Sequence, residues 1–279
     1  MITPATGSDQ AFDYLRKLVY DNSAIVLESD KRYLLEARLR PMLVREQMTS
    51  FDDLVARLGR PDAAPLRQQV VEAMTTHETS FFRDVHPFDT FRKSIIPQML
   101  LDRATLKRLN IWCGASSTGQ EPYSLALIVK ECGLGLAGWT TKLLATDLSG
   151  EIIARARAGV FSQLEVNRGL PVTMLVKYFE KVGLDWRLKE DIRRMVEFRC
   201  LNLIEAWPPL ADLDVVFLRN VLIYFDVPTK KTIFEKLARA VRPGGFLFLG
   251  GVETTLNLSN DFKQVAFGKT TVYQRNARG

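Results

Sequence analysis

Apolar residues recur at helical spacing along the N-terminal part of the chain, and no strand pattern interrupts them. The spacing predicts four helices: one over 11–19, one that runs through Arg38 to Arg45 with Asp30 as its cap, one over 51–58 and one over 66–74. Gly59 and Pro61 stop the third of these helices. We therefore expect a small all-helical domain over residues 1–77.

Short apolar runs alternate with amphipathic stretches in the rest of the chain. An amphipathic helix over 88–101, interrupted by Pro97, comes first. The predicted strands are 109–112, 141–146, 196–200, 213–218 and 245–250, with a final hairpin over 262–273 around Gly268. The predicted helices follow Pro122, cover 151–158, and cover 228–241, where Pro243-Gly244-Gly245 closes the last one.

This alternation is typical of the α/β class, with a Rossmann-like, doubly wound and mainly parallel sheet. The segment over about 159–198 breaks the alternation with glycines, a proline and irregularly spaced aromatic residues. We interpret it as a small inserted subdomain within a second domain over 78–279.

The composition, 47% hydrophobic and 25% charged, is that of an ordinary globular protein. We see no signal peptide at the N-terminus and no apolar run long enough to cross a bilayer. The three cysteines form no C-x-x-C pair, and the two histidines offer no metal-ligand spacing. We therefore expect a cytoplasmic protein with reduced thiols, without a metal site and without membrane insertion.

The net charge of +6 permits an acidic partner without identifying one. Zinc-finger spacing and basic motifs interleaved with aromatic residues are missing from the sequence, so we do not expect a nucleic-acid partner.

A glycine turn between the strand at 109–112 and the next helix is the stretch with the clearest chemistry. Gly114 and Gly119 lie five residues apart, which does not match G-x-G-x-x-G, and no lysine follows Gly119 as in a phosphate-binding P-loop. The carboxylate of Glu121 disfavours a di- or triphosphate. The turn is either a plain connection or a site for a ligand with hydroxyl groups and a positive charge.

Three further polar residues follow successive predicted strands. Asp147, Asn202 and Asn220 each come at or just after a strand end, and such ends meet on one rim of a parallel sheet. A carboxylate such as Asp147 can accept hydrogen bonds from both ribose hydroxyls, and Asn202 can donate to and accept from an adenine edge. Each residue alone can equally be a cap or a turn residue. Together they favour a nucleoside.

Six sequence blocks closely resemble those of the chemotaxis receptor methyltransferases, the CheR family, and they occur in the family's order along nearly the whole chain. The blocks are Met74-Thr-Thr-His-Glu-Thr-Ser-Phe-Phe-Arg83, Trp112-Cys-Gly-Ala-Ser-Ser-Thr-Gly-Gln-Glu-Pro-Tyr-Ser124, Ala145-Thr-Asp147, Asn202-Leu203, Phe217-Leu-Arg-Asn-Val-Leu-Ile-Tyr-Phe-Asp226 and Arg242-Pro-Gly-Gly245. The Glu-Pro-Tyr-Ser and Arg-Asn-Val-Leu-Ile-Tyr-Phe runs are the most specific of them.

The resemblance implies that the chain transfers a methyl group from S-adenosylmethionine to glutamate side chains of chemoreceptors and forms a glutamyl methyl ester. By the same resemblance, Thr79 and Arg83 contact the methionine part of the cofactor, with Arg83 near its carboxylate. Glu121 accepts a hydrogen bond from the cofactor's ammonium, which agrees with a turn that prefers a positively charged ligand. Asp147 holds the ribose.

Other residues of the pattern are expected around the base. Asn202 and Leu203 border the adenine, and Asn220 and Val221 line the floor of the site. The family commonly has Asn where this chain has His77, so His77 contacts the cofactor through a ring nitrogen or not at all.

The reaction needs no metal and no covalent enzyme intermediate, because a sulfonium methyl is already activated towards an ionised carboxylate. Orientation alone supplies on the order of 7–11 kcal/mol in such reactions. Tyr224, just past the fourth strand, is the side chain that we expect to orient the substrate; the alternative is a packed aromatic residue with a satisfied hydroxyl.

The expected partners are the cytoplasmic helices of chemoreceptors. The second predicted helix carries Lys31, Arg32, Arg38, Arg40 and Arg45, diluted by glutamates, and is either a docking face for an acidic helix or an exposed face of mixed charge. The insert between Tyr178 and Phe198 looks shorter than in family members that bind the C-terminal pentapeptide of a receptor. We therefore expect receptor recognition that is independent of this tether.

Three other functions stay open at this stage. A nicotinamide-dependent oxidoreductase has a similar fold, although the missing G-x-G-x-x-G argues against it. A non-catalytic module that senses S-adenosylmethionine or scaffolds receptors would keep the same binding residues. The same chemistry can also serve a signalling pathway other than motility.

Overall fold

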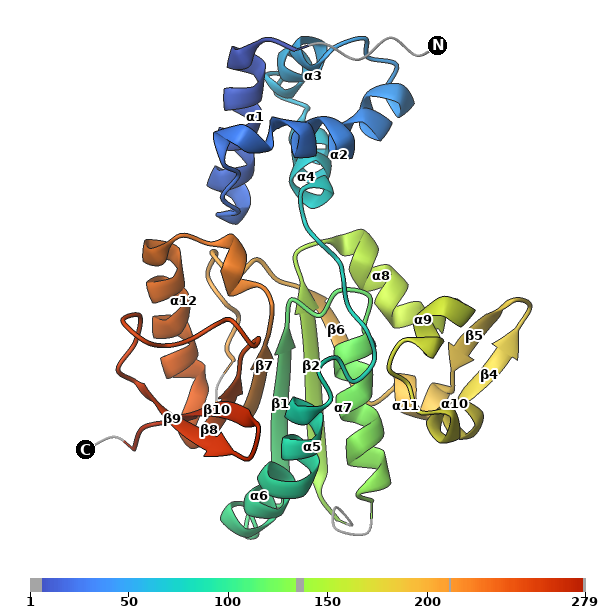
Figure 1. The fold of residues 1–279 in the computed structure, drawn as a ribbon, viewed down its shortest axis with the longest axis vertical. Coiled ribbons are helices and arrows are strands. Elements are labelled where there is room, and N and C mark those ends of the chain that lie inside the picture. The colour runs from blue at the N-terminus through green and yellow to red at the C-terminus, as the bar shows by residue number, and fades with distance from the viewer. Residues whose placement is uncertain (1–6, 134–137, 211, 278–279) are drawn as a thin grey trace. The chain divides into compact units, whose positions relative to one another are not determined.

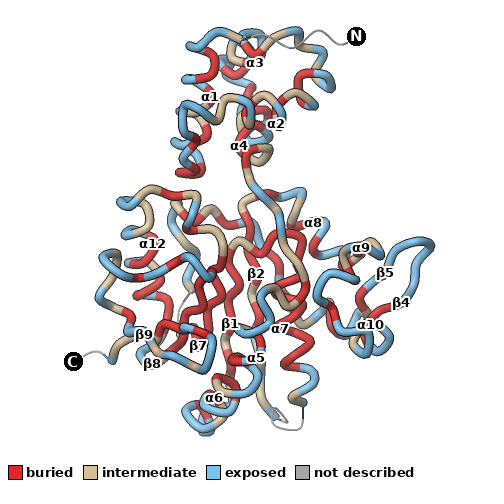
Figure 2. Tube along the Cα trace, in the orientation of Figure 1, coloured by how far each residue is buried: buried red, intermediate tan, exposed pale blue. Residues whose placement is uncertain are grey.

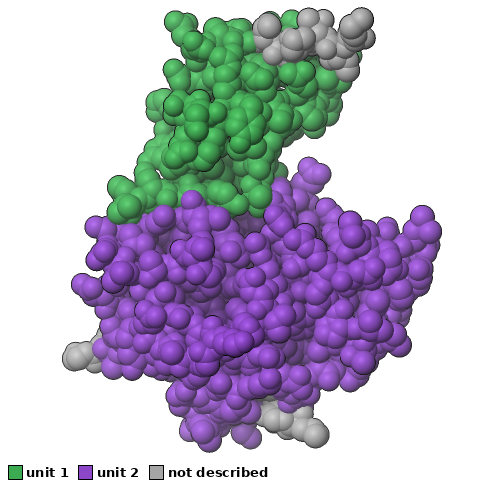
Figure 3. All heavy atoms as spheres, in the orientation of Figure 1, with its two compact units in different colours: residues 1–76, 224–229 green, residues 77–223, 230–279 purple. Residues whose placement is uncertain are grey.

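The chain forms two compact units in the computed structural model, which describes residues 7–133, 138–210 and 212–277. One unit comprises residues 1–76 and 224–229, and the other comprises residues 77–223 and 230–279 (Figure 3). We call them the helical unit and the sheet unit, and each is described by itself.

The helical unit contains the four helices that the sequence predicts: α1 (Asp9–Ser23), α2 (Arg32–Arg45), α3 (Phe51–Leu58) and α4 (Ala64–Ala73). Ser8 caps α1, and Ser50 forms a capping box with Asp53 at the start of α3. The predicted cap at Asp30 is wrong. Asp30 lies inside a 3₁₀ turn (Ser29–Lys31) that precedes α2, so its side chain is not at the cap position.

A short stretch from late in the sequence also belongs to the helical unit. The carbonyl of Tyr224 accepts the N–H of Val26 at 2.9 Å, and the hydroxyl of Tyr20 donates to Asp226 at 2.7 Å. Asp226 also accepts the N–H of Thr229 in the first turn of α12 (Val227–Ala240). The helical unit is thus built from two stretches that lie far apart in sequence.

The sheet unit contains a seven-stranded sheet that confirms the predicted α/β class (Figure 1). Its strands are β1 (Arg108–Gly114), β2 (Thr140–Asp147), β6 (Val196–Cys200), β7 (Leu213–Leu218), β8 (Val241–Phe248), β9 (Phe262–Phe267) and β10 (Thr270–Arg275). The order is β6-β2-β1-β7-β8-β10-β9. The first five run parallel, and β10 pairs antiparallel with both β8 and β9.

Helices flank this sheet and bury its strands on both faces, as a doubly wound sheet requires. They include α7 (Gln120–Glu131), α8 (Gly150–Ala158) and α12 (Figure 1). Every residue of β7 is buried, and the red segments of Figure 2 follow the strands.

The predicted helix over 88–101 is longer and is not broken by Pro97. It runs through α5 (His86–Thr90), a π-helical turn (Phe91–Ile95) and α6 (Ile96–Asp102). Pro97 stands in the first turn of α6, where its missing N–H is tolerated because the wider π turn precedes it.

Pro243-Gly244-Gly245 follows the end of the helix as predicted, but the predicted start of the next strand at Gly245 is wrong. Helix α12 ends at Ala240 and β8 begins at once, so these three residues lie inside the strand. The pairing with β7 shifts here, because Leu213 faces Val241 while Val215 faces Phe246. An added Cβ on Gly245 would lie 2.9 Å from the carbonyl oxygen of Leu213, so the irregular strand needs glycine at this position.

The segment between α8 and β6 contains a separate antiparallel sheet of order β3-β5-β4. Its elements are β3 (Val160–Phe161), α9 (Gln163–Asn167), α10 (Val172–Tyr178), β4 (Phe179–Val182), β5 (Asp185–Leu188) and α11 (Glu190–Arg193). Phe161 and Phe179 pack against Phe81, with ring centroids 5.0 and 5.8 Å away. This inserted subdomain therefore shares the apolar core of the sheet unit.

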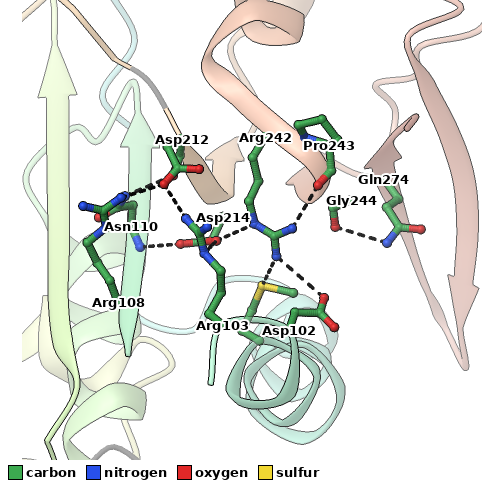
Figure 4. A network of polar contacts seen from close by, with 11 residues as sticks. Asp102, Arg103, Arg108, Asn110, Asp212, Asp214, Arg242, Pro243, Gly244 and Gln274 are labelled. Carbon is green, nitrogen blue, oxygen red and sulfur yellow. Dashed lines mark hydrogen bonds and ion pairs between the residues drawn. The ribbon is translucent and has the colours of Figure 1, made fainter. Parts of the chain in front are cut away.

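A polar network holds the amino ends of β1, β7 and β8 (Figure 4). The fully buried carboxylate of Asp214 lies 2.8 Å from Nε of Arg103 and 2.6 Å from Nε of Arg242, and it accepts the N–H of Asn110 at 2.8 Å. Asp212 accepts from Arg103 and from Arg108, which starts β1. Two cations and a backbone N–H thus compensate the buried charge, which would otherwise be costly.

Among the described residues, none of the helices has the length and apolar character that a membrane crossing would require.

Candidate functional site

The carboxyl ends of β6, β2, β1 and β7 lie side by side along one edge of the sheet, and the strand order reverses between β1 and β7. Ligands of open α/β sheets bind outside the strand ends at such a reversal. The residues that the sequence singles out follow these four strands, so the fold brings their backbones to one rim.

The turn after β1 is a tight loop with unusual backbone geometry. Ala115 and Ser117 have φ of 53° and 50°, and Gly119, just before α7, has φ of 98°. A Cβ added to Gly119 would approach the Cβ of Ala156 to 3.2 Å. Positive φ is unfavourable for residues other than glycine, so neighbouring contacts must hold this turn in place.

Asp147 supplies one of these contacts from the end of β2. Its Oδ2 atom accepts the backbone N–H of Ser117 at 2.8 Å, and its Oδ1 atom accepts that of Ser149 at 3.3 Å. The side chain is buried, yet a carboxylate has about four acceptor positions, so lone pairs remain for hydroxyl groups of a ligand. Asp147 thus stabilises the turn and can also accept hydrogen bonds from a ligand.

The carboxylate of Glu121 is paired with a residue that the sequence analysis did not place in the site. Nη1 of Arg219 donates to Oε2 of Glu121 at 2.5 Å, and both side chains are buried. The other oxygen, Oε1, lies 3.4 Å from the thiol of Cys113. Burial, together with the charge of Glu121, raises the pKa of this thiol well above its usual range. The carboxylate of Glu121 is therefore held on one side by Arg219, while Oε1 faces only a weak donor.

Residues 77–85, which we call the approach segment, run beside the turn. The carbonyl of His77 accepts the hydroxyl of Ser117 at 2.9 Å, and the N–H of Phe82 donates to Ser124 of α7 at 3.0 Å. Arg83 donates from Nη1 to the carbonyl of Glu78 at 2.9 Å and is half-buried. These bonds place His77 and Arg83 in the same part of the molecule as the turn.

The end of the approach segment is held in strained conformations. Phe82, Asp84 and Val85 have φ of 50°, 68° and 51°. Positive φ is exceptional for a β-branched residue such as Val85. Each such residue costs of order 1–3 kcal/mol and persists only where surrounding contacts enforce it.

The loop after β6 is closed by a lysine from α12. Nζ of Lys236 donates to the carbonyl oxygens of Leu203, Ile204 and Glu205 at 2.7–3.0 Å, and burial lowers the pKa of this lysine. Asn202 accepts the N–H of Ile204 and donates to Glu205 at 3.1 Å. Asn202 and Leu203 therefore have fixed backbones at the rim.

The end of β7 is held by Glu253, which the sequence analysis also missed. Its buried carboxylate accepts four backbone N–H groups at 2.6–2.9 Å, from Asn220, Val221, Leu222 and Gly250. Asn220 has φ of 58°, so this carboxylate fixes a left-handed backbone. A signal for Glu253 was available, because it follows two glycines just after β8, the next strand along the rim.

The structure thus gathers nine of the sequence-predicted residues within the sheet unit: His77, Thr79 and Arg83 on the approach segment, Glu121 on α7, Asp147 at the end of β2, Asn202 and Leu203 after β6, and Asn220 with Val221 after β7. Tyr224 is grouped with the helical unit instead.

One buried polar atom in the turn is left over for a ligand. Oγ of Ser116 is buried and has no hydrogen-bond partner among the residues that the structure describes. Buried hydroxyls normally find a partner, so this atom fits a site that is completed by a polar molecule. The hydroxyl of Ser116 and the acceptor oxygens of Asp147 and Glu121 suit a nucleoside with a cationic tail. No group of three or more potential metal ligands occurs in the described part of the chain.

Comparison with known proteins matches both parts of the chain. The family model described as CheR methyltransferase, SAM binding domain, covers residues 77–271, and the one described as CheR methyltransferase, all-alpha domain, covers residues 10–75. Chemotaxis protein methyltransferase 1 of Pseudomonas aeruginosa is 38% identical over 273 residues, which are 96% of this chain and 99% of that protein.

A second relative, chemotaxis protein methyltransferase Cher2 of Pseudomonas putida, is 36% identical over 267 residues, 94% of this chain and 97% of its own length. Among solved structures, a TehB-like SAM-dependent methyltransferase from Corynebacterium glutamicum is 10% identical, with a TM-score of 0.38 over 70% of this chain and 97% of that one. This structural likeness carries no conclusion about function.

Proposed function

The chain belongs to the CheR methyltransferase family, and from that premise we propose that it methylates glutamate side chains of chemoreceptors. It is a chemotaxis methyltransferase whose cofactor is S-adenosylmethionine. The observation that carries the proposal is the match of both family domains, in order, to a chain whose Arg83, Glu121 and Asp147 are held around one rim. The nicotinamide alternative is dropped, because the matched domain binds a different cofactor.

The bound cofactor supplies a methyl group on a positively charged sulfur, already activated for attack by a carboxylate oxygen. In the proposed site, Asp147 holds the ribose, Glu121 receives the ammonium, and Arg83 and Thr79 bind the carboxylate end. Asn202 and Leu203, after β6, border the base, and Asn220 and Val221, after β7, line the floor of the site; His77 contacts the cofactor through a ring nitrogen or not at all. The protein orients the reacting groups and excludes water from the attacking glutamate, so it needs no general base.

We propose that the receptor is recognised through the basic side of α2. The contacts of the helical unit sharpen which residue to test. Arg38 donates to the carbonyls of Met74 and Thr75 and to the hydroxyl of Thr76, so its guanidinium holds the end of α4. Charge reversal at Arg38 would damage the helical unit itself. Arg40, on the same helix, is the better probe, and Arg60, exposed in the loop after α3, is its matched control.

A tether-independent mode of recognition is part of the proposal. In the inserted subdomain, only Gly183 and Leu184 connect β4 to β5, which supports the expectation of a short insert. Titration with a receptor C-terminal pentapeptide should then give no measurable binding. Saturable binding would overturn this part of the proposal and leave the rest intact.

Tyr224 remains the residue that we propose to orient the substrate glutamate. Because an ionised glutamate needs no base, Tyr224→Phe should slow methyl transfer only modestly. Complete loss of transfer with unchanged cofactor affinity would show that the hydroxyl has a larger role.

The experiment that tests the function measures transfer of labelled methyl from S-adenosylmethionine to cytoplasmic fragments of chemoreceptors. Label must be released by base as methanol, which is diagnostic of a carboxyl methyl ester. Arg40→Glu should raise KM for the receptor fragment while Arg60→Glu leaves it unchanged. The same protein should act in the cytoplasm, where these receptor helices lie.

Three results are distinguishable. Base-labile label that disappears with Asp147→Ala supports the proposal. Cofactor binding without transfer to any receptor fragment supports a sensing or scaffolding module instead. Transfer to a carboxylate of a different signalling protein keeps the chemistry and changes the pathway.

A further inference from the structure

We propose that Arg219 is a positioning residue for the cofactor's amino-acid end, because it ties the ammonium acceptor Glu121 to the segment that carries Arg83. The inference rests on the proposed function and adds to it. Arg219 is assigned no contact with the methyl group or the receptor. It acts through Glu121, which binds the ammonium of the cofactor, and through Arg83, which binds its carboxylate.

The geometry places one guanidinium between two carboxylates from different parts of the chain. Nη1 of Arg219 donates to Glu121 on α7, while Nη2 donates to Asp84 at 2.6 Å and to the carbonyl of Arg83 at 3.2 Å. The side chain of Arg219 is 1% exposed, so both of its ion pairs are shielded from water on the arginine side. Its guanidinium carbon lies 5.7 Å from the ring centroid of Phe88, which closes one face.

The pairing fixes which oxygen of Glu121 faces a ligand. Arg219 takes Oε2, and Oε1 meets only the weak donor Cys113. A carboxylate oxygen with an unfilled acceptor position suits an ammonium group. The cation next to it also compensates a buried carboxylate whose charge would be costly without a partner.

The other side of Arg219 accounts for the strained approach segment. Asp84 and Val85 adopt positive φ, and a conformation of this kind needs enforcement from its surroundings. The bonds from Arg219 to Asp84 and to the carbonyl of Arg83 are such an enforcement. They set the backbone from which the Arg83 side chain extends. The spacing between the cationic and anionic binding groups of the site is thus fixed by one residue.

A lysine in place of Arg219 keeps the positive charge but lacks the two Nη groups that bind Glu121 and Asp84 at the same time. Lysine carries a point charge and cannot reach two carboxylates in the planar geometry of a guanidinium. Arg219→Lys therefore separates the effect of charge from that of the bridge. Asp84→Asn breaks the same bridge from its exposed end, since the Asp84 side chain is 57% exposed and its replacement leaves the core intact.

Two ligands separate positioning from general support of the fold. S-adenosylhomocysteine carries the ammonium and carboxylate, whereas 5′-methylthioadenosine has the same nucleoside thioether without them. Calorimetry with the full chain would give both dissociation constants. Arg219→Lys and Asp84→Asn should each weaken S-adenosylhomocysteine by about tenfold or more, the effect of losing a charge-assisted hydrogen bond. Affinity for 5′-methylthioadenosine should stay within about twofold, a difference below half a kilocalorie per mole.

The double variant and a control complete the test. If Arg219 and Asp84 act as one unit, combining the substitutions should weaken S-adenosylhomocysteine no further than Arg219→Lys alone. Arg242→Lys replaces another mostly buried arginine with two carboxylate partners, in the network at the amino ends of the strands, and should change neither ligand selectively.

Equal weakening of both ligands by Arg219→Lys would overturn the proposal, because it would assign Arg219 to support of the whole site. Unchanged binding of both would also overturn it. If the effects of the two substitutions on the binding free energy were additive, Arg219 and Asp84 would not act as one unit, and the proposed bridge would be refuted. A wild-type protein that binds neither ligand would instead refute the proposed function, whereas selective loss of S-adenosylhomocysteine supports the positioning role even where no receptor substrate is found. Where Arg219→Lys fails to fold, Asp84→Asn carries the same comparison.

Discussion

Asp147, at the end of β2, accepts the backbone N–H of Ser117 at 2.8 Å and thereby fixes the turn that follows β1. The residue proposed to bind ribose is therefore also the residue that shapes the loop around the ligand. Replacement of Asp147 should have two separable effects, one on ligand hydroxyls and one on the turn.

We predict that Asp147→Ala lowers affinity for S-adenosylhomocysteine by about a hundredfold, since charged hydrogen bonds are worth about 1.5–3 kcal/mol each. Asp147→Asn keeps one acceptor oxygen and should lose less. Calorimetry on both variants gives the comparison. Equal affinity in the wild type and Asp147→Ala would exclude Asp147 from the site.

Glu253 is predicted to be essential for the rim although it lies outside the six sequence blocks that carry the family resemblance. In Glu253→Gln the amide NH₂ group would face N–H donors, so at least one buried donor loses its acceptor, at a cost of about 1–3 kcal/mol in unfolding free energy. Urea unfolding measures the loss. Glu180→Gln, exposed on β4, is the control and should have little effect. A wild-type unfolding curve for Glu253→Gln would contradict the assignment.

The network at the amino ends of the strands predicts a pH effect. Partial burial acts to raise the pKa of Asp212, but hydrogen bonds and charge from Arg103 and Arg108 together outweigh it and lower this pKa. A carboxyl group with a lowered folded-state pKa adds stability above its unfolded pKa, near 4, and loses that contribution as the pH falls further. The stability difference between wild type and Asp212→Asn should therefore shrink between about pH 6 and pH 3.

The measurement is urea unfolding at several pH values, with Asp185→Asn on β5 as an exposed control. A difference that stays constant down to about pH 3 would show that Asp212 has an ordinary pKa in the folded protein.

The three cysteines should react with a neutral thiol reagent in a fixed order. Cys200 is exposed, Cys132 is half-buried with a pKa raised by burial, and Cys113 is buried with its pKa raised further. The thiolate is the reactive form, so Cys200 should label first and Cys113 only on unfolding. Mass spectrometry of the native protein would reveal the order. Fast labelling of Cys113 would mean that Glu121 is more accessible than its burial indicates.

Gly169 is predicted to tolerate no side chain. Its φ is 91°, and an added Cβ would lie 2.0 Å from the carbonyl oxygen of Phe81, in the approach segment. Gly169→Ala should destabilise the protein by at least about 1–3 kcal/mol and weaken cofactor binding. Gly183→Ala has a similarly positive φ and open space around it, so it reports the backbone cost alone. Identical behaviour of the two variants would argue against the contact with Phe81.

Local sequence signals predicted the elements and the polar strand ends well. Strand and helix periods located β2, β6 and β7 within a residue or two, because buried strands read as apolar runs between turn residues. The parallel arrangement of such sheets predicted that Asp147 and Asn220 lie on one edge, whereas the strand order came only from the structure.

Residues that act through distant partners were not predictable in this way. Glu253 binds N–H groups more than thirty positions earlier in the chain, and Arg219 reaches Asp84 across 135 positions. The two glycines before Glu253 mark its position near a strand end, but no local pattern encodes the distant partners of either residue. The start of β8 was predicted at Gly245 rather than at Val241 for the opposite reason, since pairing with β7 overrode the strong local turn signal of Pro243-Gly244-Gly245.

The helical unit closes on residues 224–229, so the chain passes from one unit to the other three times. A deletion that removes residues 1–76 would leave behind the Tyr224 carbonyl and the Asp226 carboxylate without Val26 and Tyr20, their partners in the intact chain. The helical unit is therefore not an interchangeable module. Chimaeras that graft it from a relative must transplant the 224–229 stretch as well, and recombination between relatives is constrained at both places together.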